Sequence, residues 1–141
     1  MQPIPLQPSS NKLILGDFKP AGGFPNPCED HLGKSISLDS LLIKRPSSTF
    51  LFTLEGDSMS PTLTDGSIIV VDRSAKVATG RIVLATIAGE FIVKEIELKK
   101  DKALFKSVNP LYPTIEIEID KDNDWENNVV WGVVTGSVKV F

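Results

Sequence analysis

The sequence has one cysteine, one histidine and no long apolar run. The single cysteine, Cys28, excludes an intrachain disulfide, and His31 and Cys28 together are too few for a Cys/His metal cluster. We therefore expect no metal and no other cofactor. No stretch approaches the roughly 18 apolar residues of a membrane span, and residues 1–18 lack the basic start and apolar run of a secretory signal. The sequence thus predicts a cytoplasmic protein without a membrane partner.

An excess of positive charge is also missing. The 15 Lys and Arg residues are outnumbered by 18 Asp and Glu residues, which gives a net charge of -3. Because nonspecific nucleic-acid binding relies on clustered basic side chains, we expect no direct sequence-specific DNA binding. The 141 residues, 41% hydrophobic and 23% charged, are typical of one globular domain with an appendage.

Prolines are concentrated at the start of the chain. Residues 1–30 contain six of the ten prolines and the Gly22–Gly23 pair. Proline removes amide donors and restricts the preceding residue, so this stretch cannot sustain a helix or a central strand. We predict a flexible N-terminal arm over residues 1–30 and a folded domain over 31–141. Within the arm, Lys12–Leu15 is an apolar island suited to a sheet edge or a groove, and the glycines give an open peptide suited to cleavage.

From about residue 36 the chain consists of short β-rich runs separated by turn residues, which predicts a mostly β fold. The Ala88–Gly89 pair predicts a tight hairpin turn. Alternation then puts Lys94 on the same strand face as Ile92 and Ile96. The segment Ser37–Ile43 fits either one helical turn or a strand. The runs are Thr49–Leu54, Ser67–Asp72, Ile82–Ile87, Glu90–Leu98, Ala103–Val108, Thr114–Ile119 and Val129–Phe141.

Ser58 lies in the segment GDSMSPTL, where Gly, Asp, Ser and Pro follow a hydrophobic run. This composition predicts an exposed turn at the end of a strand. Most serines in such turns only hydrogen-bond their own loop, and that reading competes with a role as nucleophile. A nucleophilic serine needs a base, and His31 is a poor one because it adjoins the proline-rich arm and lies on no recognisable strand.

Lys94 is the alternative base, since Ser–Lys pairs are a known variant of the serine triad. A lysine acts as a base only when neutral, and burial among apolar neighbours lowers its pKa. Phe91, Val93 and the two isoleucines can provide that burial. The competing interpretation is an edge-strand lysine that discourages aggregation. The residues by themselves leave both alternatives open.

These residues resemble the LexA-like self-cleaving serine peptidases, and most closely the UmuD-type SOS mutagenesis proteins. The resemblance covers roughly residues 20–141, and its most specific part is GDSM at 56–59 followed by GEFIVK, with Lys94 36 positions after Ser58 (94 minus 58). It implies a LexA/UmuD-like peptidase fold of short twisted antiparallel sheets. Its other matching segments are GFPNP at 23–27, Leu41–Ile43, Asp65–Gly66, Ile69–Asp72, Asn109–Pro110 and Gly132–Val134.

The resemblance also implies roles. Ser58 would attack the chain's own Gly22–Gly23 bond and Lys94 would accept its proton, with the oxyanion held by the backbone amides of Ser58 and Met59. The family has alanine or cysteine where Gly22 stands, which leaves Ala21–Gly22 as a second candidate bond.

The implied partners are a second copy in a homodimer, an activated RecA filament on single-stranded DNA, and a UmuC-like Y-family translesion polymerase. The C-terminal run Val129–Phe141 fits either a dimer-edge strand or a core strand.

Three other functions compete with this one. The string SMSPTL at 58–63 resembles the box of type I signal peptidases, which need a membrane anchor that this sequence lacks. A LexA-type repressor needs a helix-turn-helix domain, for which the arm is too short and too rich in proline. The third is a non-catalytic polymerase-binding β-module in which Ser58 and Lys94 are relics.

Overall fold

The computed structural model describes residues 3–5, 13–14 and 35–141. Two compact units are present, one formed by residues 1–6 with 45–141 and the other by residues 7–44. The predicted boundary at residue 30 lies outside the described residues, as do Cys28 and His31.

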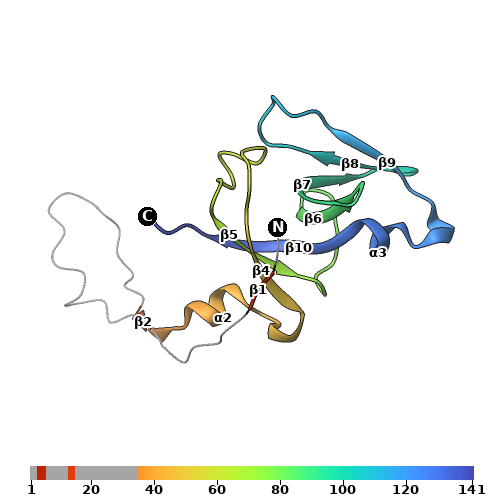
Figure 1. Cartoon of the computed structure of the whole chain (residues 1–141). Helices are drawn as coiled ribbons and strands as arrows, with labels where there is room; N and C mark the ends of the chain where they lie inside the picture. Colours follow the sequence, from red (N-terminus) through yellow and green to blue (C-terminus); the bar gives the residue numbers. More distant parts are fainter. Residues whose placement is uncertain (1–2, 6–12, 15–34) are drawn as a thin grey trace, which may run out of the picture. The chain divides into compact units, whose positions relative to one another are not determined.

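The larger unit contains an eight-stranded sheet in which every neighbouring pair is antiparallel. The strand order is β1-β4-β5-β10-β6-β7-β8-β9 (Figure 1). This architecture confirms the predicted mostly β fold. The strands are β1 Pro3–Ile4, β4 Thr49–Thr53, β5 Ile68–Asp72, β6 Ile82–Ile87, β7 Glu90–Leu98, β8 Lys102–Lys106, β9 Ile115–Glu118 and β10 Val130–Val138.

The hairpin of β6 and β7 has the predicted bounds and turn. Ala88 and Gly89 have φ values of 52° and 78°, and the register pairs Ile87 with Glu90. Two consecutive residues with positive φ match the right-handed twist of the flanking strands. The turn therefore fixes the register along β7, including the position of Lys94.

The C-terminal strand β10 lies between β5 and β6 in the sheet. Residues 130–133 pair with β6 and residues 133–138 with β5. A core position is therefore confirmed for the first part of the run, whereas residues 135–138 pair on the β5 side alone and the dimer-edge interpretation of the end of the run stays a prediction. Val133 is completely buried. The strand begins at Val130 because the short helix α3, Trp125–Val129, precedes it.

Short helices connect some of the strands. In the larger unit these are the 3-10 helices η1 Pro46–Ser48 and η2 Lys121–Asn123, besides α3. In the smaller unit, β2 Leu13–Ile14 pairs with β3 Ser35–Ile36, so the two central residues of the apolar island predicted in the arm form a strand. The ambiguous segment at 37–43 is the helix α2, Leu38–Leu42, whose N-cap Ser37 accepts a hydrogen bond from the Ser40 amide.

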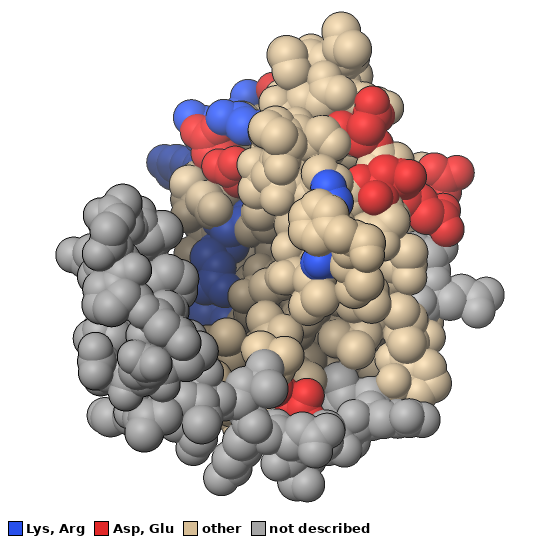
Figure 2. All heavy atoms as spheres, turned by 90° about the vertical axis from the view of Figure 1, so that its left-hand side faces the viewer, with Lys and Arg blue, Asp and Glu red and all other residues tan. Residues whose placement is uncertain are grey.

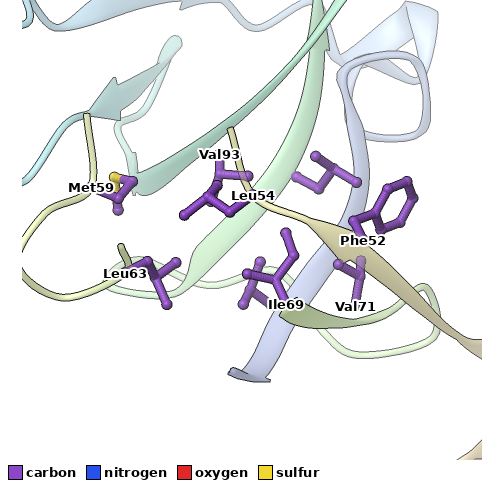
Figure 3. Packing of buried hydrophobic residues seen from close by; sticks show 9 residues of the cluster. Phe52, Leu54, Met59, Leu63, Ile69, Val71 and Val93 are labelled. Atoms are coloured by element: carbon purple, nitrogen blue, oxygen red, sulfur yellow. The ribbon is translucent and has the colours of Figure 1, made fainter. Parts of the chain in front are cut away.

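Buried side chains of the larger unit form two clusters. The first contains Met59 and Val93, the neighbours in sequence of the two predicted catalytic residues (Figure 3). The second contains Ile96 and has Ile92 packed against it, which confirms that the face of β7 predicted for Lys94 is apolar. Within the part of the chain that the structure describes, no helix is long and apolar enough to cross a membrane.

Candidate active site

The loop that carries Ser58 leaves the sheet after β4 and returns to β5. Two backbone bonds close its base: the Leu54 amide donates to the Ser67 carbonyl and the Gly66 amide donates to the Leu54 carbonyl, both at 2.8 Å. At Gly56 the backbone has a φ of +92°, which glycine adopts without Cβ strain. Its amide donates to the Asp65 carboxylate at 2.7 Å. The loop is thus held at both ends.

Ser58 is half-buried at the centre of a turn. The Ser60 amide donates to the Asp57 carbonyl at 3.1 Å, so Ser58 and Met59 are the two central residues. Met59 is only 1% exposed and anchors the turn in the first cluster. No hydrogen bond joins the Ser58 hydroxyl, or the Ser58 and Met59 amides, to any other residue that the structure describes. The structure therefore does not support the interpretation that the Ser58 hydroxyl hydrogen-bonds its own loop.

Lys94 lies on β7, between β6 and β8, and is 7% exposed. It is not on an edge strand, so the interpretation as an aggregation-blocking edge lysine is wrong. Burial lowers the pKa of Lys94 from its ordinary value of 10.5, because the apolar surroundings disfavour the charged ammonium. Its Nζ donates to Ser107 Oγ at 2.8 Å. The side chain is therefore a fixed amine that loses its proton more readily than a solvated lysine.

The register of the sheet explains why Lys94 meets Ser107. On one side β6 places Val83 opposite Lys94. On the other side β8 pairs Lys106 with Glu95, so the next step of the antiparallel register places Ser107 opposite Lys94. Ser107 is the first residue after β8.

Residues 107–112 connect the lysine to the loop of the serine. The Asn109 amide donates to the Ser58 carbonyl at 2.9 Å, and the Asn109 side chain donates to the Asp57 carbonyl at 3.3 Å. The same segment holds Lys94 through Ser107, two residues earlier. Since two residues span roughly 7 Å of extended chain, the Ser58 backbone and the Lys94 amine are fixed to nearby points of one segment.

Tyr112 makes a third connection. Its hydroxyl donates to the Asp57 carboxylate at 2.5 Å, and its ring centroid is 5.4 Å from Lys94 Nζ, within cation–π range. The hydrogen bond to Asp57 raises the pKa of the Tyr112 hydroxyl. One aromatic side chain therefore contacts both the residue before Ser58 and the amine of the lysine.

The structure thus ties Ser58 and Lys94 to the same segment. It adds roles for Ser107, Asn109 and Tyr112 that sequence reasoning missed, although Asn109 stands in one of the segments that match the family. For Ser107 a signal was available in the predicted hairpin of β7 and β8. If Leu98 pairs with Ala103 across a four-residue turn, counting back pairs Lys94 with Ser107. The two candidate scissile bonds, between Ala21 and Gly23, lie outside the described residues.

Charged groups elsewhere do not suggest another chemistry. Among the described residues there is no group of three or more His, Cys, Asp or Glu side chains that could hold a metal ion. Among the described residues visible in Figure 2, most are uncharged, acidic side chains are grouped at the upper right, and basic side chains lie mainly at the left. This distribution agrees with the net negative charge of the sequence.

Known proteins resemble the chain over most of its length. Residues 12–134 match the family described as Peptidase S24-like. Protein SamA of Salmonella typhimurium (strain LT2) is 42% identical over 94 residues, which cover 66% of this chain and 66% of SamA, just under two thirds. Protein MucA of Escherichia coli is 35% identical over 119 residues, 84% of this chain and 78% of MucA. Protein ImpA of Escherichia coli is 37% identical over 115 residues, 80% of this chain and 74% of ImpA.

Proposed function

The chain belongs to the S24-like peptidase family and is of the UmuD type, and from this premise we propose that it cuts its own N-terminal arm with Ser58 as nucleophile and Lys94 as general base. The observation that supports this most is the buried amine of Lys94. It lies on an interior strand, burial lowers its pKa, and Ser107 holds it beside the segment that binds the Ser58 backbone.

In the proposed reaction the neutral Lys94 amine takes the proton of Ser58 Oγ as the oxygen attacks the carbonyl carbon of Gly22. The oxyanion that forms is bound by the amides of Ser58 and Met59, which donate to no other described residue. The C–N bond to Gly23 then breaks, and the Lys94 ammonium returns the proton to the leaving nitrogen. Water, deprotonated by Lys94, hydrolyses the ester on Ser58, which releases a new carboxylate at Gly22 and restores both side chains.

The partners of this activity are part of the proposal. A filament of RecA on single-stranded DNA would accelerate cleavage by stabilising the conformation in which the arm occupies the site, which is a shift of population and requires no catalytic group from the filament. The trimmed chain would act as a homodimer and as an accessory subunit of a Y-family translesion polymerase.

A time course of the purified protein between pH 7 and pH 10 tests the chemistry. We expect a shorter product to appear faster as the pH rises, because more of Lys94 is then neutral. Ser58→Ala should abolish cleavage. Ser60→Ala is the matched control, since this serine lies in the same turn, and it should be cleaved at a rate close to that of the parent.

Mass spectrometry of the products identifies the bond. A new amino terminus at Gly23 supports the Gly22–Gly23 assignment, and one at Gly22 transfers the cut to Ala21–Gly22. If Ser58→Ala shortens as fast as the parent, Ser58 is not the nucleophile. If the parent remains intact at every pH and with a RecA filament, the chain is a non-catalytic module.

A further inference from the structure

Strand β4 has only a two-residue strand, β1, on its outer side. The backbone hydrogen bonds at the two ends of β4 show in which direction the N–H and C=O groups of its residues point. The Arg73 amide donates to the Ser48 carbonyl and the Leu54 amide to the Ser67 carbonyl, so the even-numbered residues direct their backbone groups to β5. Because the direction alternates along an antiparallel strand, the N–H and C=O groups of Thr49, Leu51 and Thr53 face the outer edge.

The sequence of β1 fits this edge. The register places Ile4 opposite Leu51 and Pro3 opposite Phe52. Ile4 therefore stands where the ladder needs a donor, and it has an N–H group. The prolines on both sides of it stand at positions whose nitrogen faces away from β4, where no donor is needed.

Pro3 and Pro5 also prevent a further strand from pairing with the outer side of β1. A further strand added outside β1 would need N–H groups from Pro3 and Pro5, which have none. Proline on an edge strand is one of the ways in which proteins prevent edge-to-edge association. β1 thus completes the ladder toward β4 and blocks it on the other side.

A groove lies alongside this pairing. It has a volume of about 350 Å³ and lies between residues 3–5 on one side and Pro46, Ser47, Thr49 and Phe50 on the other. Its lining is mainly apolar, so it accepts a hydrophobic side chain of an extended strand and not a charged one.

We propose that β1 is a removable cap, and that the outer edge of β4, together with the groove wall formed by Pro46, Ser47, Thr49 and Phe50, is a docking site for an extended segment of a partner protein that takes the place of β1. The segment that fits has one apolar residue with a free amide opposite Leu51, as Ile4 has. Removal of the cap rests on the proposed function, because the Gly22–Gly23 cut would separate residues 1–22 from the domain.

The concentrations of the linked and the released strand explain why the cut would expose the outer edge of β4. A covalently linked strand competes for its site at an effective concentration on the order of 1 mM. After the cut, the fragment is present only at the concentration of the protein, for example about 1 µM. The ratio of occupied to free β4 edges then falls roughly 1000-fold, because it is proportional to the concentration of the strand. The released residues 1–22 would keep two pairings of two residues each, β1 with β4 and β2 with β3. Pairings this short do not hold a free peptide at such a concentration.

Hydrogen exchange of the Leu51 amide tests the cap in the full-length Ser58→Ala chain, in which the proposed nucleophile is absent. Ile4→Pro removes the single donor of β1 and keeps an apolar side chain, and Ile4→Val is the matched control. We expect the exchange of Leu51 to accelerate at least tenfold in Ile4→Pro and not in Ile4→Val. The amides of Phe50 and Phe52, which face β5, should stay protected and show that the fold is intact. Equal protection of Leu51 in both variants overturns the proposal.

A labelled peptide of residues 1–8 tests docking in trans. At millimolar concentration it should shift the NMR signal of Leu51 in the Ile4→Pro chain and leave the Ile4→Val chain unchanged, and a peptide carrying Ile4→Pro should not bind either. Absence of binding to the uncapped chain overturns the docking site.

The parent chain, after it has cut itself, tests the link to cleavage. Rapid exchange of Leu51 in the product supports the link, whereas retained protection refutes it and leaves the peptidase proposal standing. If the parent does not cut itself, the peptidase proposal and this link fail, while the two tests in the Ser58→Ala chain still decide the cap and the docking edge.

Discussion

Removing the Ser107 hydroxyl tests whether this side chain holds the Lys94 amine for catalysis. Ser107 Oγ accepts a hydrogen bond from Lys94 Nζ at 2.8 Å. A hydrogen bond to a charged group contributes about 1.5–3 kcal/mol and one between neutral groups about 0.5–1.5 kcal/mol. Ser107→Ala therefore destabilises the ammonium more than the neutral amine, and the pKa of Lys94 falls further below its ordinary value.

Two effects on cleavage follow from these energies. At high pH, where the amine is neutral in both proteins, the loss of about 0.5–1.5 kcal/mol of positioning slows cleavage roughly 2- to 13-fold. The midpoint of the pH–rate profile moves to lower pH, because the variant loses its proton earlier. A substitution that only disturbed folding would lower the rate without moving the midpoint in this direction.

The assay is the rate of product formation on gels between pH 6 and pH 10.5, together with an NMR titration of Lys94 Nζ that needs no cleavage. Ser107→Thr keeps the hydroxyl and should keep the midpoint. Ser137→Ala, at an exposed position of β10, controls for the loss of a serine. A midpoint that stays in place or rises in a folded Ser107→Ala protein refutes the reasoning.

Three further substitutions have definite outcomes. Lys94→Met should abolish cleavage and raise the free energy of unfolding at pH 7. Because burial lowers the pKa of Lys94 in the folded state, the stability of the parent should increase as the pH rises from that pKa toward 10.5. In urea denaturation the free energy of unfolding of the parent should therefore approach that of the variant over this pH range. Gly132→Ala should cost about 1–3 kcal/mol, since its Cβ would lie 2.6 Å from Val71 Cγ1, and the cost should shrink in a Val71→Ala background. Tyr112→Phe loses the bond to Asp57 and should slow cleavage less than tenfold, with Tyr112→Ala slower because it also removes the ring near Lys94.

Local patterns in the sequence were sufficient for the strands of the larger sheet from β4 onward, whereas β1 lies in the proline-rich arm and was not predicted. The hairpin of β6 and β7 is an example, because its turn residues determine the conformation of the residues next to them. The structure has the predicted bounds, Ile82–Ile87 and Glu90–Leu98 on either side of Ala88–Gly89. The position of β10 within the sheet could not be predicted from local patterns. A strand between β5 and β6 depends on pairing with segments far away in the chain, and an apolar run alone fits an edge or a centre equally well.

The same division applies to the candidate site. The turn composition and the apolar neighbours made Ser58 and Lys94 candidates, and the family resemblance supplied their predicted roles. The burial of Lys94 confirms the environment that was predicted. The contacts of Asn109 and Tyr112 with residues 57–58 were not predicted, because they join parts of the chain about 50 positions apart. No local pattern marks an asparagine amide that will bind a distant carbonyl.

The antiparallel register of β7 and β8 ties the amine of Lys94 to the segment that also binds the loop of Ser58. Lys94 and Ser107 face each other because Leu98 pairs with Ala103, and two residues beyond Ser107 the Asn109 amide binds the Ser58 carbonyl. A slip of one residue would turn Ser107 to the opposite face of the sheet and would separate the amine from its acceptor. The turn at 99–101 lies between Lys94 and Ser107 in sequence, and its length sets this alignment. An insertion there should therefore impair cleavage, because it would shift Ser107 out of its position opposite Lys94.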